Sequence, residues 1–237
     1  MVSSGSCADQ VLDQADGALT RLDRLKAFLL TAVDLDGEDH GKWHFLTQEA
    51  RAACIVGVFA ELEALTRTFL TTINEEITAA HFAISDLRPC LRGLAGHVHF
   101  ESLRDSSDSA NIWSRRTAVT TFESSRELAI MPLPTRGPQP PLDGRTLTPA
   151  HFLRVWQIYG LDGDPVPDLA SSQTLQKLSG LRNDIAHGNL PFSEIFRTAG
   201  TSAASIEGYL TQMSLFVIHL AYAWSGYATG RSYLQVP

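Results

Sequence analysis

The sequence predicts an all-α protein. Apolar residues recur at helical spacing in several long segments, Gly and Pro stand where such segments begin or end, and alternating strand-like stretches are nearly absent. The 237 residues, of which 44% are hydrophobic, are enough for one substantial core. We therefore expect a single α-helical domain that spans residues 1–237.

Two long helices are expected in the first third of the chain. The first runs from about Gln10 to Val33. Its apolar stripe consists of Leu12, Ala15, Leu19, Leu22, Leu25, Phe28 and Leu29. A polar loop over 34–42 follows, and Thr47 can cap the second helix, which runs to about Asn74. The apolar face of that helix consists of Ala50, Cys54, Val58, Leu62, Leu65 and Phe69.

Shorter helices and a long loop are expected in the middle of the chain. Pro89 suits the first turn of a helix over about 90–104, and a further helix spans 111–122. The density of Pro and Gly that follows excludes regular structure and predicts an insertion loop over about 126–148. A helix over 149–160 then begins at a Pro and ends at a Gly.

The last two helices complete the predicted bundle. Leu175, Leu178 and Leu181 recur at three-residue spacing, and a Gly and then a Pro follow His187, so this helix should end there. The final helix is expected over about 202–223. Its apolar face consists of Ile206, Leu210, Met213, Phe216, Val217 and Leu220.

Composition restricts the setting of the protein. A formal net charge of −7 argues against a broad coat for nucleic acid, although a local basic cleft is compatible with it. The widely spaced Cys7, Cys54 and Cys90 indicate reduced thiols rather than a disulfide framework. Acidic residues occupy the N-terminus where a signal peptide needs an apolar core, and the longest apolar run is too short to span a bilayer. We therefore expect a cytoplasmic protein that makes no membrane contact.

One polar cluster interrupts the apolar pattern, the segment 181–188 with the sequence LRNDIAHG. Asn183 and His187 are four residues apart and share a face, whereas Arg182 projects roughly 140° away from His187 on an ideal helix. One helix cannot bring Arg182 and His187 together. A second copy packed antiparallel across a two-fold axis would place both pairs in one cleft, so we expect a homodimer with a composite site.

The segment 181–188 resembles the Arg-x4–6-His motif that ends one helix of the bundle in the HEPN superfamily. The similarity is closest to the stand-alone HEPN-like ribonucleases of prokaryotic toxin and defence systems. The segment 58–65, VFAELEAL, also looks like the helix in which these proteins carry an acidic residue, and Glu63 is the better match. We expect Glu63 to reach Arg182 or His187 of its own protomer, where a carboxylate would hold the Arg in place.

The resemblance implies a metal-independent endoribonuclease that acts as a toxin or antiviral effector. His187 would take the proton of the ribose 2′-hydroxyl or protonate the 5′-oxygen that leaves. Arg182 would stabilise the charge that develops at phosphorus, and the cut would leave a 2′,3′-cyclic phosphate. Asn183 would position a phosphate oxygen or hold the imidazole. The expected partners are an RNA substrate, a second copy of the chain and an antitoxin or immunity protein.

Two other interpretations are weaker. The spacing of the motif also occurs at Arg92 and His97, so the context of the motif, not its spacing, carries the argument. His97 with His99, and His40 with His44, have the spacing of metal ligands, but the first pair lacks nearby carboxylates and the second lies in a polar loop, so we expect neither a metal nor a cofactor. The alternative function is a non-catalytic HEPN-like dimer that binds RNA, nucleotide or a partner protein.

Overall fold

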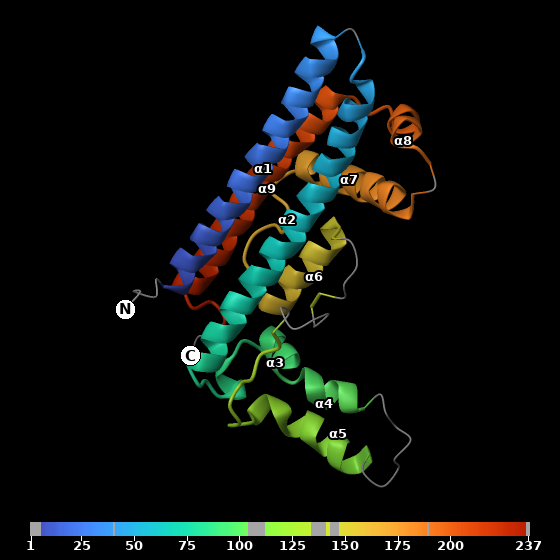
Figure 1. The fold of residues 1–237 in the computed structure, drawn as a ribbon. Coiled ribbons are helices and arrows are strands. Elements are labelled where there is room, and N and C mark those ends of the chain that lie inside the picture. Colours follow the sequence, from blue (N-terminus) through green and yellow to red (C-terminus); the bar gives the residue numbers. More distant parts are fainter. Residues whose placement is uncertain are drawn as a thin grey trace.

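The computed structural model describes residues 6–39, 41–103, 112–133, 141–142, 147–188 and 190–235. Within these ranges the chain forms helices joined by turns and loops and no strand, so the all-α prediction is confirmed (Figure 1). The elements are α1 (Cys7–Glu38), α2 (His44–Ala79), η1 (Ile84–Asp86), α3 (Pro89–Ala95), α4 (His97–Ser102), α5 (Ile112–Thr121), η2 (Phe122–Ser124), α6 (Pro149–Tyr159), α7 (Leu169–His187), α8 (Phe192–Ala199) and α9 (Ala203–Thr229). None of these helices is long and apolar enough to cross a membrane.

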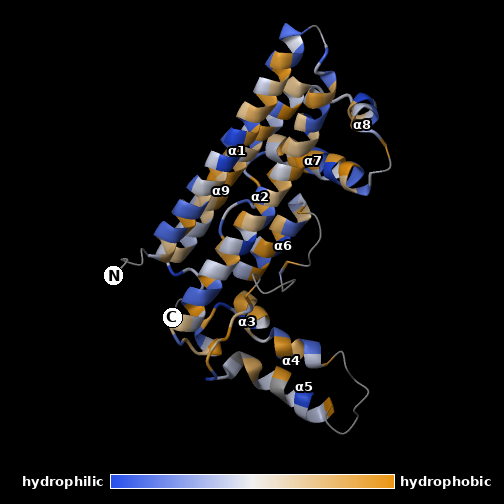
Figure 2. Ribbon diagram, viewed as in Figure 1, coloured by the Kyte–Doolittle hydropathy of each residue, from blue (hydrophilic) through white to orange (hydrophobic). Residues whose placement is uncertain are grey.

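Three long helices, α1, α2 and α9, lie side by side and form the main bundle, in which α1 runs antiparallel to the other two (Figure 1). Hydrophilic and hydrophobic residues alternate along α1 and α2, as expected of amphipathic helices (Figure 2). The stripe predicted for the first helix is only partly right. Leu22 and Leu29 are buried in the bundle, whereas Leu12 and Phe28 are exposed.

Both N-terminal helices are longer than predicted. Ser6 caps α1: its hydroxyl accepts the Asp9 N–H at 3.2 Å, and the Asp9 carboxylate accepts the Ser6 N–H at 3.0 Å. The helix also continues to Glu38, because the polar residues that follow the apolar stripe still hydrogen-bond as a helix. Thr47 does not cap α2. Thr47 lies inside α2, and its buried hydroxyl donates to the Ala32 carbonyl of α1 at 3.1 Å, which joins the two helices.

The middle of the chain departs from prediction at one glycine. The expected helix over 90–104 is broken at Gly96 into α3 and α4, because a Cβ there would overlap the ring of Phe122. The predicted ends at Arg104 and Asn111 lie outside the described residues. Together, α3, α4 and α5 form a smaller lobe at one end of the bundle (Figure 1).

The insertion loop predicted over 126–148 contributes to the core. Its described parts contain no helix, as expected, but Ala129, Met131 and Leu147 are buried. Residues 134–140 and 143–146 of this loop lie outside the described ranges. The helix that follows agrees with prediction: α6 has Pro149 in its first turn and ends at Gly160, which has a φ of 66°.

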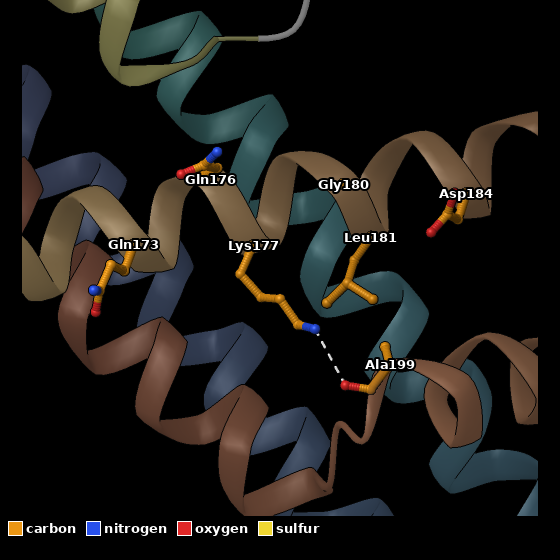
Figure 3. A pocket seen from close by; sticks show the side chains of 7 residues that line it. All are labelled: Gln173, Gln176, Lys177, Gly180, Leu181, Asp184 and Ala199. Atoms are coloured by element: carbon orange, nitrogen blue, oxygen red, sulfur yellow. Dashed lines mark hydrogen bonds between the residues drawn. The ribbon is translucent and has the colours of Figure 1, made fainter.

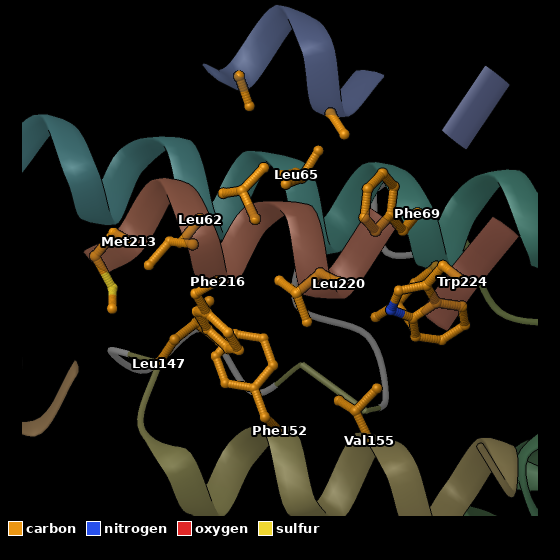
Figure 4. Close-up of a cluster of buried hydrophobic side chains, with 14 of the residues drawn as sticks. Leu62, Leu65, Phe69, Leu147, Phe152, Val155, Met213, Phe216, Leu220 and Trp224 are labelled. Atoms are coloured by element: carbon orange, nitrogen blue, oxygen red, sulfur yellow. The ribbon is translucent and has the colours of Figure 1, made fainter. Parts of the chain in front are cut away.

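Besides the α1–α2–α9 packing, one part of the core lies between α2, α6 and α9 (Figure 4). Figure 4 shows Leu62 and Phe69 of α2, Phe152 of α6, and Phe216 and Trp224 of α9 packed into one cluster. The rings of Phe152 and Phe216 meet edge to face at 4.9 Å between centroids. This apolar cluster ties the α1–α2–α9 bundle to the helix that precedes α7.

Helix α7 crosses α2 and projects to one side of the bundle with α8 (Figure 1). Asp168 caps its start, since the carboxylate accepts the Ser171 N–H at 2.6 Å. The helix ends after His187, where Gly188 adopts a φ of 61°, as the sequence predicted. The final helix begins as expected, capped by Ser202, and runs six residues beyond the predicted end to Thr229.

Candidate functional site

The candidate residues Arg182, Asn183 and His187 lie in the last two turns of α7. Arg182 follows Leu178 by four residues and Leu175 by seven, so it lies on the buried side of the helix and is itself half-buried. His187 is exposed and lies with the half-buried Asn183 on the outer side. Within one chain, the motif therefore places its Arg and His on different faces, as the helical spacing predicted.

Few contacts restrain the motif side chains. Nη1 of Arg182 donates to Oδ1 of Asn183 at 3.5 Å, the outer limit of a hydrogen bond. The imidazole of His187 makes no hydrogen bond to any residue that the structure describes. A His that anchors a bundle would be buried and paired with neighbouring polar groups. The exposure of His187 therefore argues against a structural anchoring role.

Arg92 and His97, which have the same spacing as Arg182 and His187, differ from them in their contacts. Arg92 donates to the carbonyls of Leu87 and Ser85, both at 2.9 Å, and so fastens η1 to α3. The Nδ1 atom of His97 lies 3.1 Å from the Leu94 carbonyl. These contacts indicate that Arg92 holds the local fold, which separates it from the much less constrained Arg182.

Glu63 does not make the contact expected of it. The side chain is half-buried on α2, but among the described residues it forms no hydrogen bond or ion pair with Arg182 or His187. The carboxylate of Glu61 pairs instead with Nε of Arg21 on α1 at 2.6 Å. The C-terminal end of α7, which carries the motif, projects away from α2 (Figure 1).

Two cavities lie beside the motif, between α7 and α8. The first has a volume of about 430 Å³. Its lining consists of Gln173, Gln176, Lys177, Gly180, Leu181, Asp184 and Ala199 (Figure 3). The second has a volume of about 310 Å³ and shares Asp184 and Ala199 with the first. Nζ of Lys177 donates to the Ala199 carbonyl at 3.1 Å and joins α7 to the end of α8.

Neither of these two cavities is lined by Arg182, Asn183 or His187. The sequence interpretation passed over Lys177 and Gly180, although their spacing from Gln173 and Asp184 already puts them on one polar face of α7. The polar face of α7 could therefore be predicted from the sequence. The position of α8 beside this face could not, because it depends on tertiary packing.

Among the residues described, no three or more His, Cys, Asp or Glu side chains are grouped as they would be around a metal ion. His44 contacts Asp36, with Nδ1 and Oδ2 3.4 Å apart, while His40 lies outside the described residues. The site must therefore be judged on the residues of this chain. Comparison of the chain with family models, with curated proteins and with solved structures finds no match.

Proposed function

We propose that the chain is a metal-independent endoribonuclease similar to those of the HEPN superfamily, acting in the cytoplasm as a toxin or antiviral effector. The observation that carries the proposal is the LRNDIAHG segment at the end of α7, where His187 is exposed and free of hydrogen bonds to the described residues. An imidazole in this state can exchange protons with a bound substrate.

The motif residues suit cleavage by the ribose 2′-hydroxyl. One imidazole removes the proton of this hydroxyl, whose oxygen attacks phosphorus, and the bond to the 5′-oxygen breaks as a second imidazole protonates it. The guanidinium of Arg182 neutralises charge on the phosphate oxygens, and Asn183 donates a hydrogen bond to one of them. The products are a 2′,3′-cyclic phosphate and a free 5′-hydroxyl.

A second copy of the chain would supply the second imidazole that this cleavage needs. The outer face of α7 carries Gly180, seven residues before His187, and a Cβ at this position would meet no atom within 4 Å. An exposed glycine in the middle of a helix costs about 0.5–1 kcal/mol relative to alanine, and no contact with the residues that the structure describes accounts for it here. Close packing of α7 against α7 of a second copy would provide that reason and bring two copies of His187 into one cleft.

The alternative is a dimer that binds RNA, nucleotide or a partner protein without cutting. It is favoured by the separation of Arg182 and His187 within the chain and by their position outside both cavities. Incubation of purified protein with mixed RNA in EDTA distinguishes the two functions. Cleavage that survives chelation and leaves a cyclic phosphate supports the nuclease, whereas binding without cleavage supports the alternative. Either form is open to control by an antitoxin or immunity protein.

The His187→Ala variant tests the proton-transfer role directly. Loss of a general acid or base lowers the cleavage rate on the order of 10²–10⁴-fold, and the fold should remain, because the imidazole is exposed. Arg182→Ala should lower the rate in the same assay, and His97→Ala is the matched control that should not. Cleavage by pure, folded His187→Ala protein at the wild-type rate would contradict the proposal.

A further inference from the structure

A third cavity, of about 510 Å³, lies where the start of α2, the outer face of α8 and the start of α9 meet. The residues of α8 that line it are Ser193, Phe196 and Arg197. They lie on the opposite side of this helix from Ile195 and Thr198, which face a cavity beside α7. It is thus a separate site. Its volume is within the range of pockets that hold small ligands.

The lining of this cavity is unusual for such an acidic chain. The protein has 26 Asp and Glu residues against 19 Lys and Arg, yet the cavity is lined by Arg51 and Arg197 and by no carboxylate among the described residues. The hydroxyls of Ser193 and Ser202 add further hydrogen-bond donors. The 27-residue helix α9 also begins here, so its positive end faces the same space.

Arg51 is a half-buried cation whose Nε lacks an acceptor among the described residues. Its Nε is buried and has no hydrogen-bond partner in the described structure, and its Nη1 makes one long bond of 3.4 Å to the neutral Gln48. The guanidinium lies over the ring of Phe196 at 5.6 Å. Burial lowers the pKa of Arg51, because the charged form loses hydration that these contacts do not replace.

Two acidic groups lie near the arginines. Asp36 attracts Arg51; its Oδ2 contacts Nδ1 of His44, and its Oδ1 is buried with no hydrogen-bond partner among the described residues. The Gln48 amide donates to Nε2 of His44 at 2.9 Å, which assigns the ring proton to Nδ1, facing Asp36. Glu194 binds Arg197, with 3.1 Å to Nε, on the solvent side of α8, where 73% of the Arg197 side chain is exposed. Because this ion pair is exposed to solvent, a phosphate group can compete with Glu194 for the guanidinium of Arg197.

We propose that this cavity binds a phosphate group, carried by a nucleotide or by an RNA backbone, between Arg51 and Arg197. Arginine binds phosphate oxygens through paired N–H donors, which would satisfy the donors that Arg51 leaves unused. The site does not depend on His187 or on the nuclease proposal. Helix α8 follows α7 and has one face toward this cavity and another toward a cavity beside α7.

Thermal unfolding and isothermal titration test the site, with inorganic phosphate, AMP, adenosine and a short RNA as probes at constant ionic strength. Wild type should bind phosphate-bearing probes saturably, and Arg51→Gln and Arg197→Gln should each weaken binding by about 10- to 100-fold. Arg21→Gln is the matched control, because Arg21 is also exposed and paired with a Glu but lies on α1. Phosphate stabilises proteins generally, so the difference between variants is the result that counts.

The probes separate the sources of phosphate. Binding of inorganic phosphate and AMP, but not adenosine, assigns the site to a free phosphate ligand, and binding of RNA alone assigns it to the backbone. The test measures binding and not cleavage, which keeps it apart from that of the nuclease. If Arg51→Gln does not fold, Arg197→Gln still decides. The proposal is overturned if no probe binds saturably, or if the wild type and the folded arginine variants bind equally.

Discussion

At the scale of single residues, one buried polar network joins four parts of the fold. Asn74 on α2 is fully buried; its Nδ2 donates to the Pro132 carbonyl at 2.7 Å and its Oδ1 accepts the Tyr159 hydroxyl at 2.8 Å. The Tyr227 hydroxyl on α9 donates to the Tyr159 carbonyl at 2.7 Å. Because each of these polar groups is paired, the network holds the loop, α6 and α9 to α2 without leaving an unpaired buried group.

The Asn74→Leu variant should destabilise the protein. It leaves the Tyr159 hydroxyl and the Pro132 carbonyl without partners in the core, and each unpaired group lowers the free energy of unfolding by about 1–3 kcal/mol. Urea denaturation measures the loss. Tyr222→Phe is a suitable control. The Tyr222 side chain is 72% exposed, so its replacement should hardly change the free energy of unfolding. An Asn74→Leu protein as stable as wild type would show that the network contributes nothing.

The three cysteines should differ in reactivity toward a thiol reagent at pH 8. Burial raises the pKa of Cys54 to about 11, and burial with the neighbouring Glu76 raises the pKa of Cys7, so both remain thiols at this pH. Cys90 is exposed. We expect one fast-reacting thiol that Cys90→Ser removes, with the other two reacting only after unfolding. Three equally fast thiols would contradict this assignment.

Local signals in the sequence predicted some of these residues and not others. The position of His187 in the last turn followed from the Gly and Pro after it, and both are neighbours in the chain. The lack of a contact between Glu63 and Arg182 or His187, and the unpaired Nε of Arg51, depend on where α7 and α8 approach α2. Residues next to Glu63 and Arg51 in the sequence do not carry that information.

At the scale of elements, the start of α7 depends on Asp168. Hydrogen bonds from the Ser171 backbone, more than those from its side chain or Gln212, lower the pKa of this carboxyl below its ordinary 3.8. The charged cap therefore stabilises the fold at neutral pH, and this contribution is lost as the pH falls through the lowered pKa. The helix that carries the motif is thus held at its first turn by one side chain.

The Asp168→Ala variant should unfold at a lower temperature than wild type at pH 7, because the Ser171 N–H loses its acceptor. The difference in Tm should shrink as the pH is lowered below 3.8, where protonation weakens the cap of the wild type as well. Asp168→Asn, which keeps a capping oxygen, should fall between the two at pH 7. A constant difference from pH 7 to pH 3 would exclude the carboxylate as the cause.

Helix ends were predictable where turn residues mark them and unpredictable where tertiary contacts do. Pro149, Gly160 and Gly188 mark the ends of α6 and α7 in the sequence itself. The break at Gly96 exists because the Phe122 ring packs there, and that contact joins residues distant in the chain. For the same reason the buried residues of the loop over 126–148 could not be read from its Pro and Gly content.

At the scale of the whole molecule, the arrangement leaves the outer face of α7 available to a second copy. Gly180→Gln should weaken the dimer and RNA cleavage together, because a long side chain would separate the two helices. Gly208→Gln is the matched control: Gly208 is also exposed within a helix, and a Cβ there likewise meets no atom within 4 Å. Light scattering at micromolar concentration gives the oligomeric state of each variant. A wild-type monomer, or equal effects of the two substitutions, would remove the basis for this interface.

The composite site makes a stronger prediction about mixtures. If cleavage needs His187 from both copies, a dimer of one wild-type and one His187→Ala chain is inactive. With a tenfold excess of the variant and free exchange, activity per wild-type chain should fall to roughly a tenth, the share of wild-type chains that still pair with each other. The double variant Gly180→Gln, His187→Ala should form fewer mixed dimers, because the substitution weakens the interface, and should lower activity less at the same excess. Equal activity in the two mixtures would mean that each chain cuts alone, with Arg182 and His187 meeting by a movement of α7 rather than across a two-fold axis.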